Sequence, residues 1–316
     1  MGPDASPDIR RQAAAVVTGG AGFVGHHLVG ALVEQGTRVL VVDDLSSGQA
    51  ARLPGNVELA ALDLVTGDLG GVIHSWRPSV VYHLAAQVSV PRSQADPQHD
   101  LLVNGLGTLR LLDAAKVAGV DRFVFTSSGG AIYGETTGAA AEDAPERPES
   151  FYGMHKLLAE RYVAASGMSF AIARPSNIYG PGQISGGDGA VVPTFVDAFR
   201  GGGHLVIHGD GTQSRDFVYV VDVVEALRLM GDGNQSGTWN VSSGEPTSIL
   251  GLADTLEGLM GVRPERRFVP RRVGDVHTSL LANRRLRQLG WRHRFGLDDG
   301  LKAVLGLSMA DRHDNR

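Results

Sequence analysis

Tyr152 and Lys156 in the segment YGMHK are four positions apart, so on a helix they share one face, one turn apart. The free pKa of a tyrosine is about 10, which is too high for a base at neutral pH. A neighbouring ammonium favours the phenolate and lowers that pKa. The pair therefore predicts a tyrosine that takes a proton from a sugar hydroxyl while hydride leaves the same carbon. The alternative is an exposed helix pair of no consequence.

The segment VVTGGAGFVGHHL near the N-terminus is a second candidate, because Gly19, Gly22 and Gly25 recur at every third position. The glycines lie between a strand-like run and a helix-like run, where backbone N–H groups and the helix dipole can meet a pyrophosphate. Ordinary tight turns show such spacing too, so the glycines alone are a weak signal. Asp43 stands at the end of the next strand-like run, where a carboxylate accepts hydrogen bonds from both ribose hydroxyls and repels a 2′-phosphate. Together these features predict a binding site for NAD rather than NADP.

Short strand-like runs alternate with helical runs through the first half of the chain and must position these residues. The strand-like runs are AAAVVTGG, TRVLVVDDL, NVELAALDL, SVVYHLAA, DRFVFTSS and MSFAIARPS. Helical stretches separate them, the longest over 97–118 and 152–165. This alternation predicts an α/β fold with a doubly wound parallel sheet and helices on both faces. Asp63 closes the third run, and we expect it near the adenine of the cofactor, the alternative being a plain turn residue.

After about residue 177 the pattern becomes irregular and rich in glycine and proline. We expect a smaller α/β lobe there that closes over the carboxyl edge of the sheet, while the helical run VYVVDVVEALRLM packs back on the first domain. The expected division is a flexible N-terminus 1–12, a dinucleotide-binding domain 13–176 with parts of 210–245, a substrate lobe 177–209 and 246–307, and a flexible tail 308–316.

Composition narrows the classes of function. The 316 residues are 42% hydrophobic and 20% charged, which is typical of a soluble globular protein. A net charge of −5 and the lack of a Lys/Arg tract argue against a nucleic-acid partner. The absence of cysteine excludes disulfides, Cys nucleophiles and thiolate metal sites, and we assign no metal site. No signal peptide or membrane span of about 18 apolar residues is found, so we expect a cytoplasmic protein with no membrane partner.

Seven ordered blocks resemble the extended short-chain dehydrogenase/reductase family, specifically its NAD-dependent nucleotide-sugar epimerases and dehydratases. They are TGGAGFVG, VYHLAAQVSV, FVFTSSGGAIYGE, YGMHK, RPSNIYGPGQ, GDGTQSRDFVYVVDVV and RRVGDV. The resemblance covers nearly the whole chain. It implies a Rossmann domain that holds NAD permanently, a C-terminal lobe that binds a nucleoside diphosphate sugar, and a homodimer formed through a four-helix bundle of the helices at 97–118 and 152–165.

The resemblance also assigns roles to individual positions. NAD is expected to lie against Gly19, Gly22, Phe23 and Val24 at the pyrophosphate, Asp43, Asp44, Ser47 and Gly48 at the adenosine ribose, Asp63 and Leu64 at the adenine, and Leu84, Ala85, Ala86, Tyr152 and Lys156 farther along. The sugar nucleotide is expected to contact Ser89, Ser128, Tyr152, Asn177, Val192, Arg215, Arg272, Asp275 and Ser279. The two arginines suit this role because a guanidinium fork matches diphosphate oxygens, although either could be a surface ion pair.

The residues in the segment SSGGAIYG distinguish which reaction a member of this family catalyses. Dehydratases carry an Asp-Glu pair before the tyrosine of YG and uronate decarboxylases keep a Glu there, but here Gly129, Gly130 and Ala131 occupy these positions. An elimination would lack its acid and base. Uronate-binding members also place an arginine soon after YGP, and GPGQISGGDG has none.

The resemblance therefore implies NAD-dependent 4-epimerisation of UDP-hexoses, such as UDP-glucose and UDP-galactose, through a 4-keto sugar and transient NADH. The segment GQISGGDGAVVPTF is also similar to that of bacterial and archaeal UDP-glucose 4-epimerases. Two alternatives stay open. One is another enzyme acting on nucleotide sugars, such as a dehydratase, a uronate epimerase or a ketoreductase, and the other is a non-catalytic NAD-binding protein.

Three further roles are assigned to single positions: the catalytic hydroxyl, the residue near the sugar C2 substituent and the residue between Tyr152 and Lys156. The family's catalytic Ser or Thr usually lies four residues before the tyrosine of YG, which gives Gly129, whereas counting along the strand gives Ser128. We assign the role to Ser128, with Ser127 as second choice. Ser279 stands where the family gates the room at the C2 substituent of the sugar, and its small size predicts that N-acetylated UDP-hexoses fit as well as plain ones. His155 replaces the Ser common in YGxSK, and we interpret it as structural.

Overall fold

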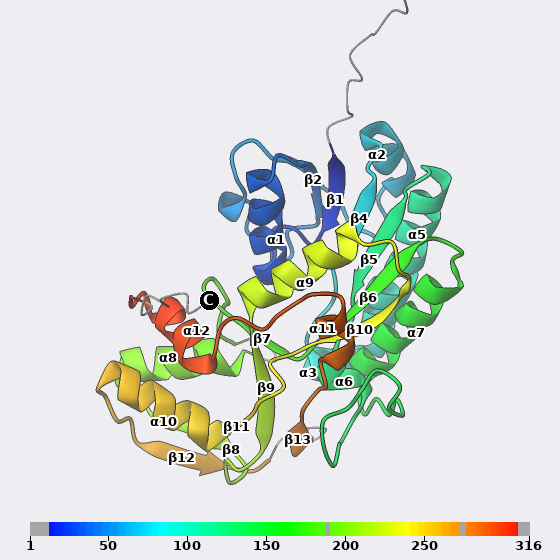
Figure 1. The fold of residues 1–316 in the computed structure, drawn as a ribbon. Helices are drawn as coiled ribbons and strands as arrows, with labels where there is room; N and C mark the ends of the chain where they lie inside the picture. Colours follow the sequence, from blue (N-terminus) through cyan, green and yellow to red (C-terminus); the bar gives the residue numbers. More distant parts are fainter. Residues whose placement is uncertain (1–12, 187–189, 272–275, 309–316) are drawn as a thin grey trace, which may run out of the picture.

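The computed structural model describes residues 13–186, 190–271 and 276–308. Its central sheet has seven parallel strands in the order β10-β6-β5-β4-β1-β2-β3 (Figure 1). The strands are β1 Ala14–Thr18, β2 Arg38–Asp43, β3 Glu58–Ala61, β4 Val80–His83, β5 Arg122–Thr126, β6 Phe170–Pro175 and β10 Gly237–Val241. Strand order reverses between β1 and β4, as in a doubly wound Rossmann sheet. The predicted fold class is confirmed.

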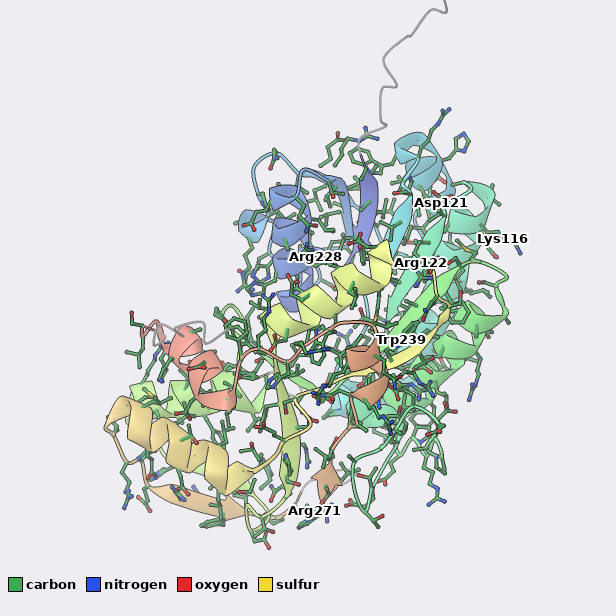
Figure 2. All side chains as sticks on the ribbon, viewed as in Figure 1. Lys116, Asp121, Arg122, Arg228, Trp239 and Arg271 are labelled. Atoms are coloured by element: carbon green, nitrogen blue, oxygen red, sulfur yellow. The ribbon has the colours of Figure 1, made fainter. Side chains whose placement is uncertain are left out.

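Helices cover both faces of this sheet because both faces of its strands are apolar. In β1, Ala15 and Val17 join the core under one layer, while Ala14 and Val16 join the core under the other. The first layer is α1 Phe23–Glu34, α9 Val220–Asp232 and α11 Arg284–Gln288, and the second is α2 Leu69–Trp76, α5 Thr108–Val117 and α7 Phe151–Ala165. The predicted return of the α9 segment to the first domain is confirmed. Figure 2 shows Arg122 beside the end of α9, where its Nε donates to the Met230 carbonyl at 3.0 Å.

Shorter helices connect these elements. They are η1 Ala50–Arg52, α3 Val90–Ala95, α4 Pro97–Asp100, the π-helical η2 Leu101–Gly107 and α6 Gly129–Ile132. α4, η2 and α5 follow one another without a break, so the helix predicted over 97–118 is confirmed with a π-helical middle. Within the described ranges, none of the helices combines the length and apolar character that crossing a membrane requires. The cytoplasmic location stays a prediction.

The rest of the chain forms a smaller α/β lobe at the carboxyl edge of the sheet (Figure 1). One sheet joins β7 Asn177–Tyr179, β9 Ser214–Tyr219, β11 Pro246–Ser248 and β13 Thr278–Ser279, and a second pairs β8 Leu205–His208 with β12 Arg266–Val269. The helices of the lobe are α8 Val191–Gly201, α10 Ile249–Met260 and α12 Leu297–Leu305. Its core includes Phe195, Phe199, Phe217 and Leu252. β9 runs directly into α9, so the chain passes from this lobe back to the Rossmann sheet. The exact division into domains stays a prediction.

Candidate active site

The turn between β1 and α1 is built so tightly that Gly19 and Gly25 cannot be replaced without a clash. Gly19 has φ +68°, and a Cβ there would lie 2.6 Å from the backbone nitrogen of Ala85. A Cβ on Gly25 would lie 2.1 Å from the Gly19 carbonyl oxygen. Gly22 is the N-cap of α1, and the first N–H groups of that helix face an end without a side-chain cap. The turn therefore has the form of a helix N-terminus that binds anions.

Asp43 joins this turn to the loop that follows β2. The side chain is 7% exposed, Oδ2 accepts from the Ala21 N–H at 3.0 Å, and Oδ1 accepts from the Leu45 N–H at 2.9 Å. Gly48 packs against it, because a Cβ there would lie 2.8 Å from Asp43 Oδ1. The exposed Asp44 accepts from Ser46 N–H and Oγ within the same loop. The loop that holds the predicted ribose contacts is thus fixed by Asp43 itself.

The remaining positions predicted for the cofactor lie along the carboxyl edge of the same sheet. Asp63 follows β3, where its Oδ1 accepts from the N–H groups of Val65 and Thr66, so it does shape a turn there. Its proximity to adenine stays a prediction. The other positions lie at the start of α1, in the loop after β2, after β3 and after β4: Phe23, Val24, Ser47, Leu64, Leu84, Ala85 and Ala86.

Lys156 is buried at the centre of this edge. It is 3% exposed, and Nζ lies 4.5 Å from the centroid of the Phe125 ring. Burial lowers its pKa from 10.5 to about 8, although the negative charges of Glu160 and Asp100 raise it in part. The ammonium is therefore still protonated at neutral pH, but only by a small margin.

His83 beneath Lys156 is neutral. Thr108 Oγ1 donates to the Asn104 carbonyl at 2.7 Å, so it accepts from His83 Nε2 at 2.9 Å. His83 Nδ1 then accepts from the Thr18 hydroxyl at 2.7 Å. Burial and the nearby Lys156 charge lower the pKa of His83 to about 3. The imidazole consequently adds no positive charge beside Lys156.

Tyr152 lies in the first turn of α7, on the same face as Lys156. Ser150 caps this helix by accepting from the Gly153 N–H at 3.1 Å, and the Tyr152 N–H donates to Ser93 Oγ at 3.1 Å. These two hydrogen bonds fix the position of the Tyr152 backbone. The predicted pairing on one helix face follows from the helix that the structure forms over these residues.

His155 points to another partner, Asp100. Its Nδ1 lies 2.6 Å from Asp100 Oδ2, and Asp100 is fully buried. Asp100 Oδ1 also accepts from Gln87 Nε2 at 2.6 Å and Asn104 Nδ2 at 3.1 Å. Gln87 in turn accepts from the N–H of Ser89, the N-cap of α3. His155 therefore fastens α7 to the helix and loop that lie alongside it, which agrees with its structural interpretation.

Three hydroxyl groups gather where β5 ends. Ser127 is buried, and its Oγ and the Oγ1 of Thr126 have no hydrogen-bond partner in the described part of the chain. Ser128 is the N-cap residue of α6 and is partly exposed. A buried hydroxyl without a partner is costly, so these groups suit hydrogen bonding to a ligand. Sequence reasoning missed Thr126, for which the run TSS at a strand end was the available signal.

Residues predicted for the sugar meet across from this strand end. A Cβ on Gly130 would lie 3.8 Å from Ser279 Oγ and 3.9 Å from Asn177 Oδ1, so these three residues face one another. Arg215 on β9 donates from Nη1 to the Ser214 carbonyl at 2.8 Å. Val192 packs in the core of the smaller lobe. Arg272 and Asp275 lie outside the described residues.

Sequence reasoning missed a buried polar cluster around Arg174 at the end of β6. Arg174 donates from Nε to Glu160 Oε1 at 2.9 Å and from Nη1 to the Tyr133 hydroxyl at 2.8 Å. The Tyr133 hydroxyl donates to Asn240 Oδ1 at 2.8 Å. Burial opposes the charge of Arg174, but its pKa is raised because Glu160 binds it. The cluster locks α6, α7 and β6 together beneath the site.

Comparisons with known proteins agree with this geometry. Residues 15–242 match the family described as the NAD dependent epimerase/dehydratase family. The UDP-glucose 4-epimerase of Mycolicibacterium smegmatis is 40% identical over 298 residues, which cover 90% of this chain and 95% of that protein. A Thermus thermophilus UDP-glucose 4-epimerase in complex with NAD superposes with a TM-score of 0.88 at 36% identity, covering 93% of this chain and 98% of that one. The Thermotoga maritima UDP-glucose 4-epimerase with UDP-glucose gives a TM-score of 0.89 at 36% identity, covering 93% and 97%.

Proposed function

Because the chain belongs to the NAD-dependent epimerase/dehydratase family, we propose that it is a 4-epimerase of UDP-hexoses, with UDP-glucose and UDP-galactose as the substrate pair. Relatives and solved structures that bear the name UDP-glucose 4-epimerase, one of them with UDP-glucose, support a UDP-sugar as substrate. The residues around the site support inversion at C4 in particular.

The glycine turn and Asp43 fit NAD. The turn offers helix N–H groups without a side-chain cap, beside Gly19 and Gly25 where a Cβ would clash, and the Asp43 carboxylate is held at the end of β2. Gly19, Gly22, Phe23 and Val24 would hold the pyrophosphate, and Asp43, Asp44, Ser47 and Gly48 the adenosine ribose. When bound, NAD supplies a reversible hydride acceptor for a sugar carbon.

Tyr152 is the proposed base that takes the proton of the sugar O4 and later returns it. Lys156 beside it on α7 would favour the phenolate and bind the nicotinamide ribose. Ser128, with Ser127 second, is proposed to hydrogen-bond O4 and so connect the sugar to Tyr152. The unpartnered hydroxyl of Ser127 supports a ligand at this strand end. The 4-keto sugar would turn in the site before hydride returns to its other face.

The observation that carries epimerisation over dehydration is that no carboxylate stands among Gly130, Ala131 and the closely packed Gly129. A Cβ there would lie 2.3 Å from Leu281 Cδ1 and 3.0 Å from the Arg174 carbonyl oxygen. A side chain at Gly129 would therefore have to displace Leu281. A Cβ at Gly130 would fit without a clash, but the residue is glycine and so brings no acid. It faces Asn177 and Ser279. The described residues at this strand end consequently offer no Asp-Glu pair for water elimination.

The substrate pocket is proposed to accept N-acetylated UDP-hexoses as well as plain ones. Ser279 is small, and across from it stands Gly130, which has no side chain. Together they leave space beside Asn177 for a substituent larger than a hydroxyl. Arg215 is proposed to bind the diphosphate, as is Arg272 by resemblance.

A homodimer is proposed through the helices η2 and α7. These helices pack on each other and expose a set of large apolar side chains, namely Leu101, Leu102, Leu106, Phe151 and Met154. A contiguous apolar surface on two adjacent helices suits a second copy that presents the same helices about a twofold axis. The result would be a four-helix bundle.

The test is proton NMR of the purified protein with UDP-galactose and no added reductant, followed over time. Appearance of the anomeric signals of UDP-glucose at equilibrium proportions would establish the 4-epimerase. Tyr152→Phe should keep bound NAD but lose at least about a hundredfold in rate, since a general base contributes at least that much. A 4-keto, 6-deoxy product would indicate a dehydratase, and no change would favour another sugar nucleotide or a silent NAD-binding protein.

A further inference from the structure

The loop that follows α6 sends one carboxylate out to the smaller lobe. Gly134 has φ +68°, and a Cβ there would lie 2.4 Å from the Arg147 carbonyl oxygen, so the chain turns sharply at this point. The next residue, Glu135, reaches β13. Its Oε2 accepts from the His277 N–H at 2.5 Å, and its Oε1 accepts from the Thr278 N–H at 2.9 Å.

β13 needs such a partner because it is a two-residue strand at the edge of its sheet. It pairs with β9 on one side, with Thr278 opposite Ser214 and Ser279 opposite Arg215. Glu135 covers the start of the free edge, because its two oxygens bind the N–H groups of Thr278, the first residue of β13, and of His277, which precedes it. The chain that follows β13 is held by a backbone hydrogen bond to the same loop, because the Ala140 N–H donates to the Leu280 carbonyl at 2.9 Å.

β13 and the residue before it carry or contact two groups proposed for the substrate, Ser279 on β13 and Arg215 on β9. Ser279 faces Gly130 and Asn177, where the sugar is expected. The His277 carbonyl accepts from the Ser214 N–H at 2.9 Å and from Arg215 Nη1 at 3.4 Å. His277 is therefore held by the negative Glu135 at its N–H and by the positive Arg215 at its carbonyl. A shift of His277 would displace the arginine proposed for the diphosphate as well as the serine at the sugar.

We infer that Glu135 is a positioning residue for the sugar nucleotide, which it serves by holding β13 and through it Ser279 and Arg215. This role rests on the proposed function. Glu135 comes only a few residues after the hydroxyl groups at the end of β5, so its two hydrogen bonds tie the reacting end of the Rossmann sheet to the substrate strand of the other lobe. The distance between these two parts of the site is thereby fixed before substrate binds.

Exposed carboxylates in surface ion pairs contribute little to stability. That small contribution to stability applies to pairs of long, mobile side chains. Glu135 instead binds two backbone N–H groups, which have no rotamer freedom of their own, and charge-assisted hydrogen bonds of this kind are stronger than neutral ones. The expected consequence is on the population of the binding-competent strand more than on global stability.

The experiment compares Glu135→Ala, Glu135→Gln and the control Asp143→Asn, which removes an exposed carboxylate from the same loop. Binding of UDP by calorimetry and KM and kcat for UDP-galactose are measured with NAD-loaded protein. For E135A we expect the Kd for UDP and the KM to rise about tenfold, because the competent strand position falls to roughly one tenth of the population. E135Q keeps one acceptor oxygen and should fall between E135A and wild type. kcat and bound NAD should stay within about twofold, and D143N should match wild type.

Each outcome separates the inference from the proposed function. Equal UDP affinity in wild type and E135A overturns the inference even where the wild type epimerises UDP-galactose. A fall in kcat with unchanged KM also overturns it, because that would place Glu135 in the chemistry. Weaker UDP binding by E135A in a protein that does not epimerise UDP-galactose supports the inference and contradicts the proposed reaction. If E135A does not fold, the intermediate affinity expected of E135Q decides, and a wild type that fails to bind UDP contradicts both.

Discussion

Replacing Lys156 with methionine should stabilise the protein at neutral pH while it removes activity. Lys156 is 3% exposed, and burial lowers its pKa from 10.5 to about 8. The proton is then held less tightly in the native state than in the unfolded chain, so the native state is destabilised wherever both states are protonated. Methionine is unbranched and uncharged, and it removes this cost while largely filling the space above Phe125.

The magnitude follows from the two pKa values. Each pKa unit corresponds to about 1.36 kcal/mol, so a pKa of about 8 in place of 10.5 costs the native state about 3 kcal/mol at pH 7. The variant also loses the contact of the ammonium with the Phe125 ring, which offsets about 1 to 2 kcal/mol of this gain in stability. K156M should therefore raise the free energy of unfolding by about 1 to 2 kcal/mol at pH 7.

The sign of the pH dependence is also fixed. The cost of protonated Lys156 is fully present below pH 8, decreases as the pH rises toward 10.5, and is absent above it. The advantage of K156M should consequently shrink to below about 1 kcal/mol by pH 10.

The assay is urea unfolding at pH 7 and pH 10, monitored by tryptophan fluorescence. NAD must be removed first, because a ligand of the native state adds its own stabilisation. Lys116→Met is the matched control, since Figure 2 shows Lys116 at the surface on α5, and its effect should stay within about 0.5 kcal/mol at either pH. A K156M protein less stable than wild type at pH 7, or a difference that is the same at both pH values, would refute the reasoning.

Three further predictions concern the cofactor, the substrate and the assembly. Gly25→Ala places a Cβ 2.1 Å from the Gly19 carbonyl oxygen, so the purified variant should retain little NAD, measured by chromatography of the released nucleotide; full retention would contradict the tight turn. Ser279→Tyr should lower kcat/KM selectively for N-acetylated UDP-hexoses, and equal loss on plain ones would contradict the proposed pocket. Met154→Glu puts a charge in the apolar face of η2 and α7 and should convert a dimer to monomers by light scattering, whereas an unchanged mass would exclude that face.

Local patterns explain which parts could be predicted from the sequence. Five of the six strand-like runs form strands that are mostly buried on both faces, so they appear as continuous apolar stretches, whereas β3 at the sheet edge is partly exposed. The spacing of Gly19, Gly22 and Gly25 reports a steric requirement within a single turn, and the four-residue spacing of Tyr152 and Lys156 reports one helix face. Each of these signals is contained in about a dozen residues of chain.

The parts that sequence reasoning missed depend on contacts between distant segments. Glu135 and His277 are 142 residues apart, and Tyr133 and Asn240 are 107 apart. Nothing in YGE or TWNV indicates which backbone N–H or amide will lie opposite. The neutral state of His83 has the same origin, because burial and the Lys156 charge, which lower its pKa, arise only in the folded protein, as do its hydrogen bonds to hydroxyl groups on β1 and α5.

The surroundings of Lys156 explain why its costly burial can serve the proposed chemistry. Two carboxylates raise its pKa, but both are already committed elsewhere: Asp100 binds His155, and Glu160 binds Arg174. Within the part of the chain that the structure describes, neither forms an ion pair with Lys156. A lysine neutralised by a close carboxylate would be cheaper to bury, but it would have less charge to offer Tyr152. His155 and Arg174 thus bind the acids, and the ammonium of Lys156 lies over the Phe125 ring without a carboxylate paired to it in the described residues.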